Sequence, residues 1–195
     1  MYNLFALAFP MADHIIGIYS PAPQSGKTLA SNVLTHQGFT RLSFAAPLKR
    51  MCIEFLMMLG YSKAAALEYV FTNKEALIPE INQTPRHLMQ TLGTEWGRDL
   101  IDNDVWLTIF EKASQEFKKI VVDDVRFVNE AEKIRQMGGE MWKIVRPGAT
   151  HNGAHSSEGQ LDNWNGFDQV IYNDGTLVEF REKVDAVIQN ARGQE

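Results

Sequence analysis

The chain has 195 residues, of which 45% are hydrophobic and 22% are charged, and this ordinary globular balance excludes wholesale disorder. That length provides one good hydrophobic core and leaves room for one inserted subdomain. The net charge of −5 argues against a protein that coats DNA or RNA, because polymer binding usually needs a basic face. It does not exclude a nucleotide, which needs only a few local cations.

Two features bear on the cellular setting. Cys52 is the single cysteine, so the chain offers no second thiol for an intrachain disulfide, and a reduced, cytoplasmic setting is the simpler interpretation. Residues 1–10 include an apolar stretch, but no Lys or Arg precedes it and it is too short to span a bilayer. We therefore expect neither a signal peptide nor a membrane anchor, and we assign these residues no function.

The first element is a short β-branched apolar run, HIIGIYS at residues 14–20, which predicts a buried strand. The sequence SPAPQSGKT follows at residues 20–28. After it, LASNVLTHQG predicts a helix of about ten residues that stops at Gly38. A strand, a glycine-containing loop and a helix in this order form the context that a phosphate-binding loop requires.

The loop itself departs from the usual G-x-x-x-x-G-K-[ST] pattern, because Pro21 stands at the first glycine and Pro23 follows. Proline has no N–H to donate to phosphate, so both prolines only shape and stiffen the loop. Gly26 allows the tight turn, Lys27 reaches the outer phosphates, and the Thr28 hydroxyl holds Mg²⁺. The residues expected to bind ATP here are Gln24, Ser25, Gly26, Lys27 and Thr28. The alternative is an ordinary turn that merely starts a helix.

The remaining elements alternate between strands and helices. Strands are expected within residues 39–45, 118–127, 140–148 and 168–175, and helices within residues 47–60, 129–139 and 176–192. Residues 61–110 are mostly helical by pattern, with Thr84 as an N-cap before Pro85. This order predicts a single α/β domain with a five-stranded, mainly parallel sheet flanked by helices. Its core comprises residues 11–45 and 117–195, and residues 46–116 form an inserted helical subdomain.

A second chemical signal lies at the end of the strand VVDDVRF. Asp123 and Asp124 end this strand and Arg126 follows. Ligands collect at the carboxyl ends of parallel strands, where an acid can orient Mg²⁺ and an arginine can grip a phosphate. We favour Asp124 as the Mg²⁺ acid because it lies nearer the strand end. The alternative is a solvated turn with a surface Arg–Asp pair.

Longer blocks carry a resemblance to a known family. QTPRHLMQTLGTEWGRDLIDNDVWL, VVDDVRFVNEAEKIRQMGGEMWKIVRPG, HSSEGQL and DQVIYNDGTL resemble the phage-type deoxynucleoside monophosphate kinases of the phosphate-loop nucleotide kinase superfamily, over residues 15–187. The resemblance implies a core that binds ATP, a helical insertion that binds the monophosphate acceptor, and a lid at residues 147–164. It implies transfer of the ATP γ-phosphoryl group to a deoxynucleoside 5′-monophosphate for deoxynucleotide supply in DNA synthesis.

The resemblance also distributes catalytic roles. The catalytic set is Lys27, Asp124, Arg126 and Arg146, with Thr28 and Asp124 holding the Mg²⁺ cofactor. Arg126 is expected to contact the acceptor as well. Arg146 closes the fourth strand at the start of the lid. Residues 147–180 contain no Lys or Arg, so either the cations come from the core and the insertion, or the lid only excludes water.

The acceptor-binding residues come from the same resemblance, and for most of them the residues leave a second interpretation open. Arg86 matches the family's acceptor-site arginine. Gln90, one helical turn on, reads the base edge or is an exposed helix residue. Trp96 stacks on a nucleobase or packs the insertion, and Arg98 reaches a phosphate or pairs with a nearby Asp. Phe44 lines the acceptor pocket or belongs to the core.

A last residue and two competing functions complete the expectations. Asn173 approaches the adenine or only forms a turn. The alternatives are another phosphate-loop kinase, acting on a nucleoside or a coenzyme precursor, and a nucleotide-binding module without catalysis. The expected partners are the small molecules ATP and a dNMP, with no nucleic acid polymer and no membrane, and a homodimer is left open. If the chain is phage-encoded, its setting is the host-cell cytoplasm.

Overall fold

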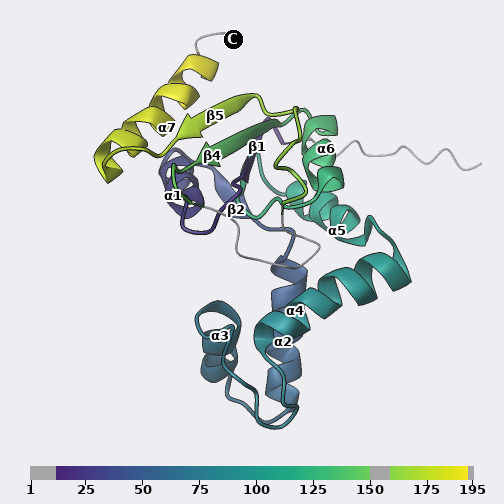
Figure 1. Ribbon diagram of the computed structural model, residues 1–195. Helices are drawn as coiled ribbons and strands as arrows, with labels where there is room; N and C mark the ends of the chain where they lie inside the picture. The colour runs from purple at the N-terminus through teal and green to yellow at the C-terminus, as the bar shows by residue number, and fades with distance from the viewer. Residues whose placement is uncertain (1–11, 150–158, 193–195) are drawn as a thin grey trace, which may run out of the picture. The chain divides into compact units, whose positions relative to one another are not determined.

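The computed structural model describes residues 12–149 and 159–192 (Figure 1). The chain divides into two compact units. One comprises Met1–Ser43 and Glu111–Glu195 and is called the core unit below; the other, Phe44–Phe110, is called the helical unit. Each unit has its own apolar core, so each is described by itself.

The core unit contains a five-stranded sheet whose strands are ordered β2-β3-β1-β4-β5. Its strands are β1 (His14–Tyr19), β2 (Thr40–Leu42), β3 (Lys119–Val122), β4 (Glu140–Val145) and β5 (Gln169–Tyr172). Every pairing is parallel. The predicted α/β fold with a parallel five-stranded sheet is therefore confirmed. Because all strands run the same way, their carboxyl ends lie along one edge of the sheet.

Strand β1 is central because its sequence suits burial on both faces. Five of its six residues are buried, as expected for a β-branched run with helices on either side. Gly17 allows close packing on one face, since a Cβ there would lie 2.4 Å from Met141 Sδ and 2.6 Å from Ile134 Cδ1. Gly17 pairs with Val122 of β3, so the segments after β1 and β3 leave the sheet side by side.

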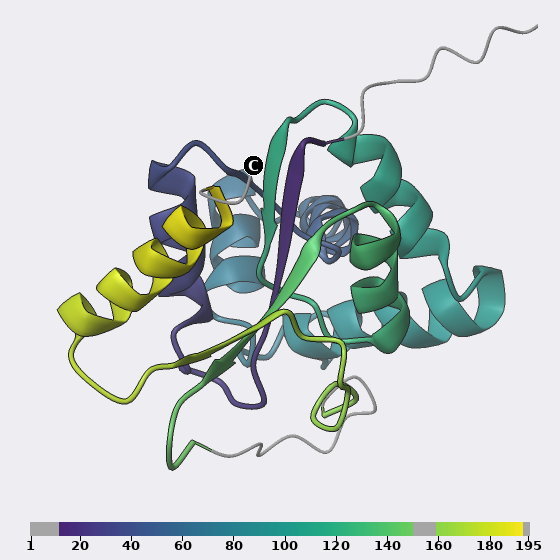
Figure 2. The same cartoon turned by 90° about the horizontal axis from the view of Figure 1, so that it is seen from above.

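Helices cover the two faces of this sheet. Helices α1 (Lys27–His36) and α7 (Leu177–Arg192) lie together on one face, and α6 (Val128–Gln136) lies on the other (Figure 2). The core beneath α1 and α7 is made of buried apolar side chains from helices and strands alike. They are Ile16, Ile18, Ala30, Leu34, Phe39, Val121, Trp142, Ile144, Ile171, Phe180, Val184 and Ile188.

The second strand of the core unit is shorter than predicted. It covers Thr40–Leu42 instead of residues 39–45. Phe39 lies between α1 and β2, and its N–H donates to the Leu34 carbonyl of α1. Pairing with β3 sets the limits of β2, and local sequence does not encode that pairing.

The helical unit contains four elements and part of a fifth. They are α2 (Ala46–Met58), α3 (Lys63–Phe71), α4 (Pro85–Thr91), the π-helix η1 (Leu92–Ile101) and α5 (Val105–Ser114), whose last residues belong to the core unit. Its core gathers Cys52, Leu56, Ala66, Val70 and Ile78. The predicted N-cap is confirmed, because the Thr84 hydroxyl accepts a hydrogen bond from the His87 N–H, and Pro85 begins α4.

The π-helix packs against α5 through one indole ring. Trp106 is buried, and its Nε1 donates to the Gly93 carbonyl at 2.8 Å. Gly97 gives the ring its space, since a Cβ there would lie 2.4 Å from Trp106 Cζ2. A ten-residue π-helix is rare, and such helices occur frequently at functional sites.

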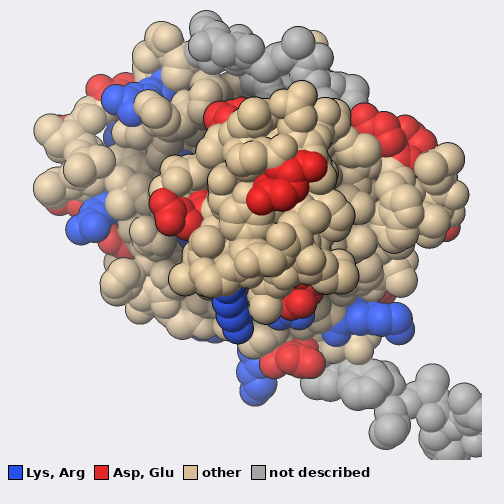
Figure 3. Space-filling model, turned by 90° about the horizontal axis from the view of Figure 1, so that it is seen from below, with Lys and Arg blue, Asp and Glu red and all other residues tan. Residues whose placement is uncertain are grey.

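The surface gives no sign of a polymer-binding face in the view that Figure 3 draws. Lys and Arg side chains there are scattered and interspersed with Asp and Glu. None of the helices in the described ranges is long and apolar enough to cross a bilayer.

Candidate active site

The segment after β1 forms a tight loop that ends in the first turn of α1. Gln24 has φ 55° and Gly26 has φ 110°, so two positions of the loop adopt left-handed backbone. At Gly26 a side chain is also excluded by space, since a Cβ would lie 2.7 Å from Asn173 Nδ2 and 3.1 Å from Phe180 Cε1. Glycine is the residue that satisfies both conditions. The loop therefore has the sharp turn that a phosphate cradle at a helix N-terminus needs.

Side chains from the ends of two other strands hold this loop from outside. Asn173, directly after β5, donates its Nδ2 to the Ser25 carbonyl at 2.8 Å. Arg146, directly after β4, donates its Nη1 to the Gln24 carbonyl at 3.0 Å. Both hydrogen bonds are made to carbonyl oxygens, which would repel a phosphate. They therefore stabilise the loop without using the N–H groups that could bind an anion.

Ser25 is the most buried residue of the loop, with 1% of its surface exposed. Its Oγ is buried and has no hydrogen-bond partner among the described residues. A buried hydroxyl without a partner costs about 1–3 kcal/mol, so its retention calls for a ligand or a water at that place. This fits a hydroxyl that serves a bound phosphate.

Lys27 is the first residue of α1 and faces charged neighbours at the same sheet edge. Burial lowers the pKa of Lys27, the Arg126 charge lowers it further, and Asp123 acts in the opposite direction. Two neighbouring cations are a natural receptor for a polyphosphate, because the anion removes their repulsion. Arg126 itself is exposed.

The two acids after β3 have different partners. Asp123 is buried and forms a two-point ion pair with Arg41 of β2, in which Arg41 Nε lies 3.1 Å from Oδ1. Burial raises the pKa of Asp123, and the Arg41 guanidinium opposes that shift. Asp124 is half-buried and accepts a hydrogen bond from Ser43 Oγ at 2.5 Å. Asp123 is thus paired with a cation of the protein. Asp124, which the sequence favours as the Mg²⁺ acid, accepts instead from a neutral hydroxyl.

The turn that carries Arg126 is fixed by the start of α6. The backbone N–H groups of Arg126 and Phe127 both donate to Glu130 Oε2, at 2.8 and 3.1 Å. Glu130 is buried, so this cap is shielded from solvent. It fixes the backbone of the segment after β3.

The donor set suits Mg²⁺ rather than a metal with an all-protein cage. The described residues contain no group of three or more His, Cys, Asp and Glu side chains that would hold a metal. Mg²⁺ usually keeps several waters and binds through one or two carboxylates together with substrate phosphates. The exposed Thr28 hydroxyl and the Asp124 carboxylate, both at the sheet's carboxyl edge, fit that limited role.

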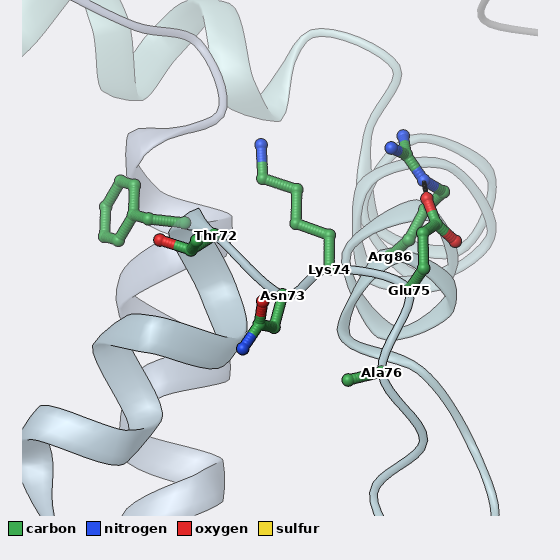
Figure 4. A pocket seen from close by; sticks show the side chains of 7 residues that line it. Thr72, Asn73, Lys74, Glu75, Ala76 and Arg86 are labelled. Carbon is green, nitrogen blue, oxygen red and sulfur yellow. Dashed lines mark hydrogen bonds and ion pairs between the residues drawn. The ribbon is translucent and has the colours of Figure 1, made fainter.

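In the helical unit, Arg86 and Gln90 lie on α4 and both are half-buried. Arg86 forms an ion pair with Glu75 through its Nε. It borders an open hollow of about 380 Å³ that is shown in Figure 4. The hollow is lined by Phe71, Thr72, Asn73, Lys74, Glu75, Ala76 and Arg86. Gln90 is not among the residues that line it.

The other predicted acceptor residues differ in exposure. Trp96 of η1 is 40% exposed, and its ring centroid lies 6.3 Å from that of Trp106. Arg98 is 7% exposed and donates Nη1 to the Asn103 carbonyl at 3.0 Å. Phe44 is buried, with its ring centroid 4.4 Å from that of Phe110. Trp96 is therefore partly open to solvent, whereas Arg98 and Phe44 are buried in the helical unit.

Part of the predicted lid falls outside the described residues. Of residues 147–164, the structure describes 147–149 and 159–164. The second part is anchored to the core unit, because Tyr19 Oη donates to Asp162 Oδ1 at 2.6 Å and Lys143 Nζ donates to the Asp162 carbonyl at 2.9 Å.

Sequence reasoning missed three residues that support the site. Arg41 and Ser43 hold the two acids, and Glu130 caps the turn after β3. A signal for the first two was available, because they stand at the end of the second parallel strand and so at the same edge as the acids. Glu130 is three residues after Phe127, the spacing of a helix-capping acid.

Comparisons with known proteins match the chain to one family. A family model described as deoxynucleotide monophosphate kinase matches residues 56–184. A protein of Acanthamoeba polyphaga mimivirus, named as a deoxynucleotide monophosphate kinase, is 31% identical over 185 residues, which cover 86% of this chain and 92% of that protein. The deoxynucleotide monophosphate kinase of Escherichia phage RB69 is 35% identical over 57% of this chain and 48% of its own length. The deoxynucleoside-5′-monophosphate kinase of Escherichia phage T5 is 37% identical over 35% of this chain and 28% of its own length.

Two solved structures align with most of the chain. TT1252 from Thermus thermophilus aligns with a TM-score of 0.50 at 16% identity, over 92% of this chain and 98% of that one. Dephospho-CoA kinase from Campylobacter jejuni aligns with a TM-score of 0.48 at 15% identity, over 93% and 98% of the two chains. At 16% identity, the likeness to TT1252 shows the fold alone.

Proposed function

Because the chain belongs to the deoxynucleotide monophosphate kinase family, we propose that it transfers the γ-phosphoryl group of ATP to a deoxynucleoside 5′-monophosphate, giving the diphosphate and ADP. The positions of the candidate residues support the proposal independently of the family match. The phosphate loop, Asp124, Arg126 and Arg146 all follow strands whose carboxyl ends share one edge of a parallel sheet. That edge is where such sheets bind nucleotides.

On the donor side, the loop binds the ATP phosphates. The first turn of α1 leaves N–H groups without helical partners, and the loop from Gln24 to Thr28 directs them to an anion. Lys27 carries the charge to the outer phosphates. Arg126 and Arg146 contact the transferring phosphoryl group, and Asn173 keeps the loop in shape through the Ser25 carbonyl rather than by reading the adenine.

Mg²⁺ is the proposed cofactor. When bound, it neutralises charge on the phosphate oxygens during transfer. Thr28 and Asp124 would hold it, and Ser43 orients the Asp124 carboxylate. Arg41 neutralises Asp123, so one carboxylate rather than two faces the phosphates.

On the acceptor side, we propose that the helical unit binds the monophosphate. Arg86 takes the 5′-phosphate, and Gln90 and Trp96 contact the base. Arg98 and Phe44 act through packing, since both are buried. The acceptor phosphate is already anionic, so transfer needs positioning and charge neutralisation rather than a strong general base.

We further propose that ATP and the dNMP are small-molecule partners met in the host-cell cytoplasm. The viral sources of the three relatives support that setting.

A coupled ADP-release assay tests the function. The full chain is incubated with ATP and Mg²⁺ and with each of the four deoxynucleoside monophosphates, their ribo counterparts and the corresponding nucleosides. We expect ADP release with one or more deoxynucleoside monophosphates. Release with a nucleoside alone would replace the proposal with a nucleoside kinase, and ATP binding without release for any acceptor would indicate a non-catalytic module.

A further inference from the structure

The hollow beside Arg86 is lined by a second cationic side chain. Lys74 lies in the connection between α3 and α4, and its side chain borders the same hollow. Figure 4 shows its ammonium on the same side of this connection as the terminal nitrogens of Arg86. Both side chains are half-buried, so their charges are less screened than those of fully exposed side chains.

The connection that carries Lys74 is held at both of its ends. On the α3 side, the Asn73 N–H donates to the Glu68 carbonyl at 2.8 Å, and Asn73 Nδ2 donates to Glu68 Oε1 at 2.9 Å. On the α4 side, the Arg86 N–H donates to the Lys74 carbonyl at 3.0 Å. This last bond fixes the backbones of the two cationic residues against each other. The pair is thus arranged before any ligand arrives, which lowers the entropy cost of binding.

Glu75 shapes the other side of the hollow. It accepts from Arg86 Nε, and Figure 4 shows the terminal nitrogens of Arg86 directed away from this contact. A guanidinium held by its Nε edge presents its remaining donors in a fixed direction. With Glu75 included, the three charged side chains still sum to one positive charge, which suits an anionic ligand.

We propose that Lys74 is a second cationic ligand of the acceptor, and that it binds the 5′-phosphate of the deoxynucleoside monophosphate together with Arg86. The inference rests on the proposed function, because it takes the acceptor to be a monophosphate. Arg86 supplies directional hydrogen bonds to two phosphate oxygens, and Lys74 supplies a compact charge to a third. Selection of a monophosphate over a nucleoside then follows because both cations attract the negative charge that the nucleoside lacks.

The test replaces Lys74 in the full chain and measures steady-state kinetics with each dNMP and, separately, with ATP. Lys74→Ala should raise the KM for the dNMP by roughly 10- to 100-fold, the value of a charge-assisted hydrogen bond, and leave the KM for ATP within about twofold. Lys74→Arg keeps the charge and should recover most of the loss. Lys63→Ala is the matched control, since Lys63 is an exposed lysine of the same unit and does not line the hollow.

Direct binding separates this inference from the proposed function. Calorimetric titration of wild-type chain and Lys74→Ala with a dNMP and with its nucleoside needs no turnover. Weaker dNMP binding by the variant, with unchanged nucleoside binding, supports phosphate binding by Lys74 even if no phosphoryl transfer occurs. If the wild-type chain phosphorylates dNMPs and Lys74→Ala leaves both the KM for the dNMP and the dNMP affinity unchanged, the role proposed for Lys74 is wrong. The proposed function then still stands.

Discussion

The two proposed anion sites of this protein are built in opposite ways. In the core unit, the phosphate loop offers backbone N–H groups, and its carbonyls are held by side chains from β4 and β5. In the helical unit, the hollow offers the side chains of Lys74 and Arg86, and a backbone bond holds them together. The proposed donor site thus consists of main-chain groups that side chains hold in place. The proposed acceptor site consists of side chains that a main-chain hydrogen bond holds in place.

This difference predicts how each site responds to change. A backbone site cannot be deleted by one substitution, but it depends on the residues that fix its shape, as Gly26 and Asn173 do. A side-chain site loses a defined share of its affinity with each cation removed, and salt weakens the attraction of each remaining cation for the ligand. Four experiments test that contrast.

We expect the largest effect at Lys27, whose side-chain charge adds to the backbone N–H groups of the phosphate loop. Lys27→Ala should lower kcat/KM for ATP by roughly 100- to 1000-fold, because a donor aimed at charge that develops in transfer is lost. The steady-state assay with saturating dNMP measures this loss, and circular dichroism checks that the fold persists. Lys118→Ala, an exposed lysine before β3, is the control. Near-normal transfer by the variant would remove Lys27 from the mechanism.

Arg86→Ala should have the next largest effect, and on the other substrate. We expect the KM for the dNMP to rise about 10- to 100-fold, with the KM for ATP nearly unchanged, because the lost bonds are to the acceptor phosphate. Raising the salt concentration should reduce the difference between wild type and variant. Arg50→Ala, an exposed arginine on α2, serves as the comparison. Unchanged acceptor kinetics would remove Arg86 from the acceptor site.

Asn173→Ala tests the support of the phosphate loop. The loss of one neutral hydrogen bond should raise the KM for the donor about five- to tenfold. If Asn173 acts through the loop, ATP and GTP lose the same factor, because both present identical phosphates. A loss confined to ATP would instead indicate the adenine contact expected from sequence. Asn32→Ala, on the exposed side of α1, should behave like the wild type.

The smallest expected effect is in the pH dependence of donor binding. Because burial and Arg126 lower the pKa of Lys27, this lysine loses its proton at a lower pH than the 10.5 of a free side chain. The charged form exists below the lowered pKa, so ATP affinity should fall as pH rises through it. Titration calorimetry across the alkaline range measures the fall, and Lys27→Arg should abolish it, since arginine stays charged. A flat profile in the wild type would contradict the role of the Lys27 charge.

Much of the core unit was predictable because its signals are local. HIIGIYS, the helix pattern of LASNVLTHQG and the glycine stop at Gly38 each report backbone conformation within a few residues. The edge of the sheet was also predictable, since parallel strands end on the same side whatever their order. The extent of β2 was not predictable from Phe39 onward, because pairing with β3 sets it and that pairing is distant in sequence.

Candidate site residues were predictable by type but not by partner. The sequence indicated Asn173 as a polar residue after the last strand, yet its contact with the Ser25 carbonyl spans 148 positions of the chain. Likewise, Lys74 belongs to no motif. It becomes a candidate only because it lines the hollow and its carbonyl accepts from the Arg86 N–H. The π-helix over residues 92–101 left no pattern that distinguishes it from an α-helix.

Sequence alone was enough to predict the order of strands and helices, the tight turn at Gly26 and the family. These features depend on short-range conformation and on contiguous motifs. The packed fold was needed to show which side chains support the loop, that Asp123 pairs with Arg41 while Asp124 accepts from Ser43, and that Lys74 and Arg86 border one hollow. The physical reason is that backbone preference acts over a few residues, whereas a charge or a hydrogen bond takes its partner from whatever the packed sheet and helices bring within about 3 Å.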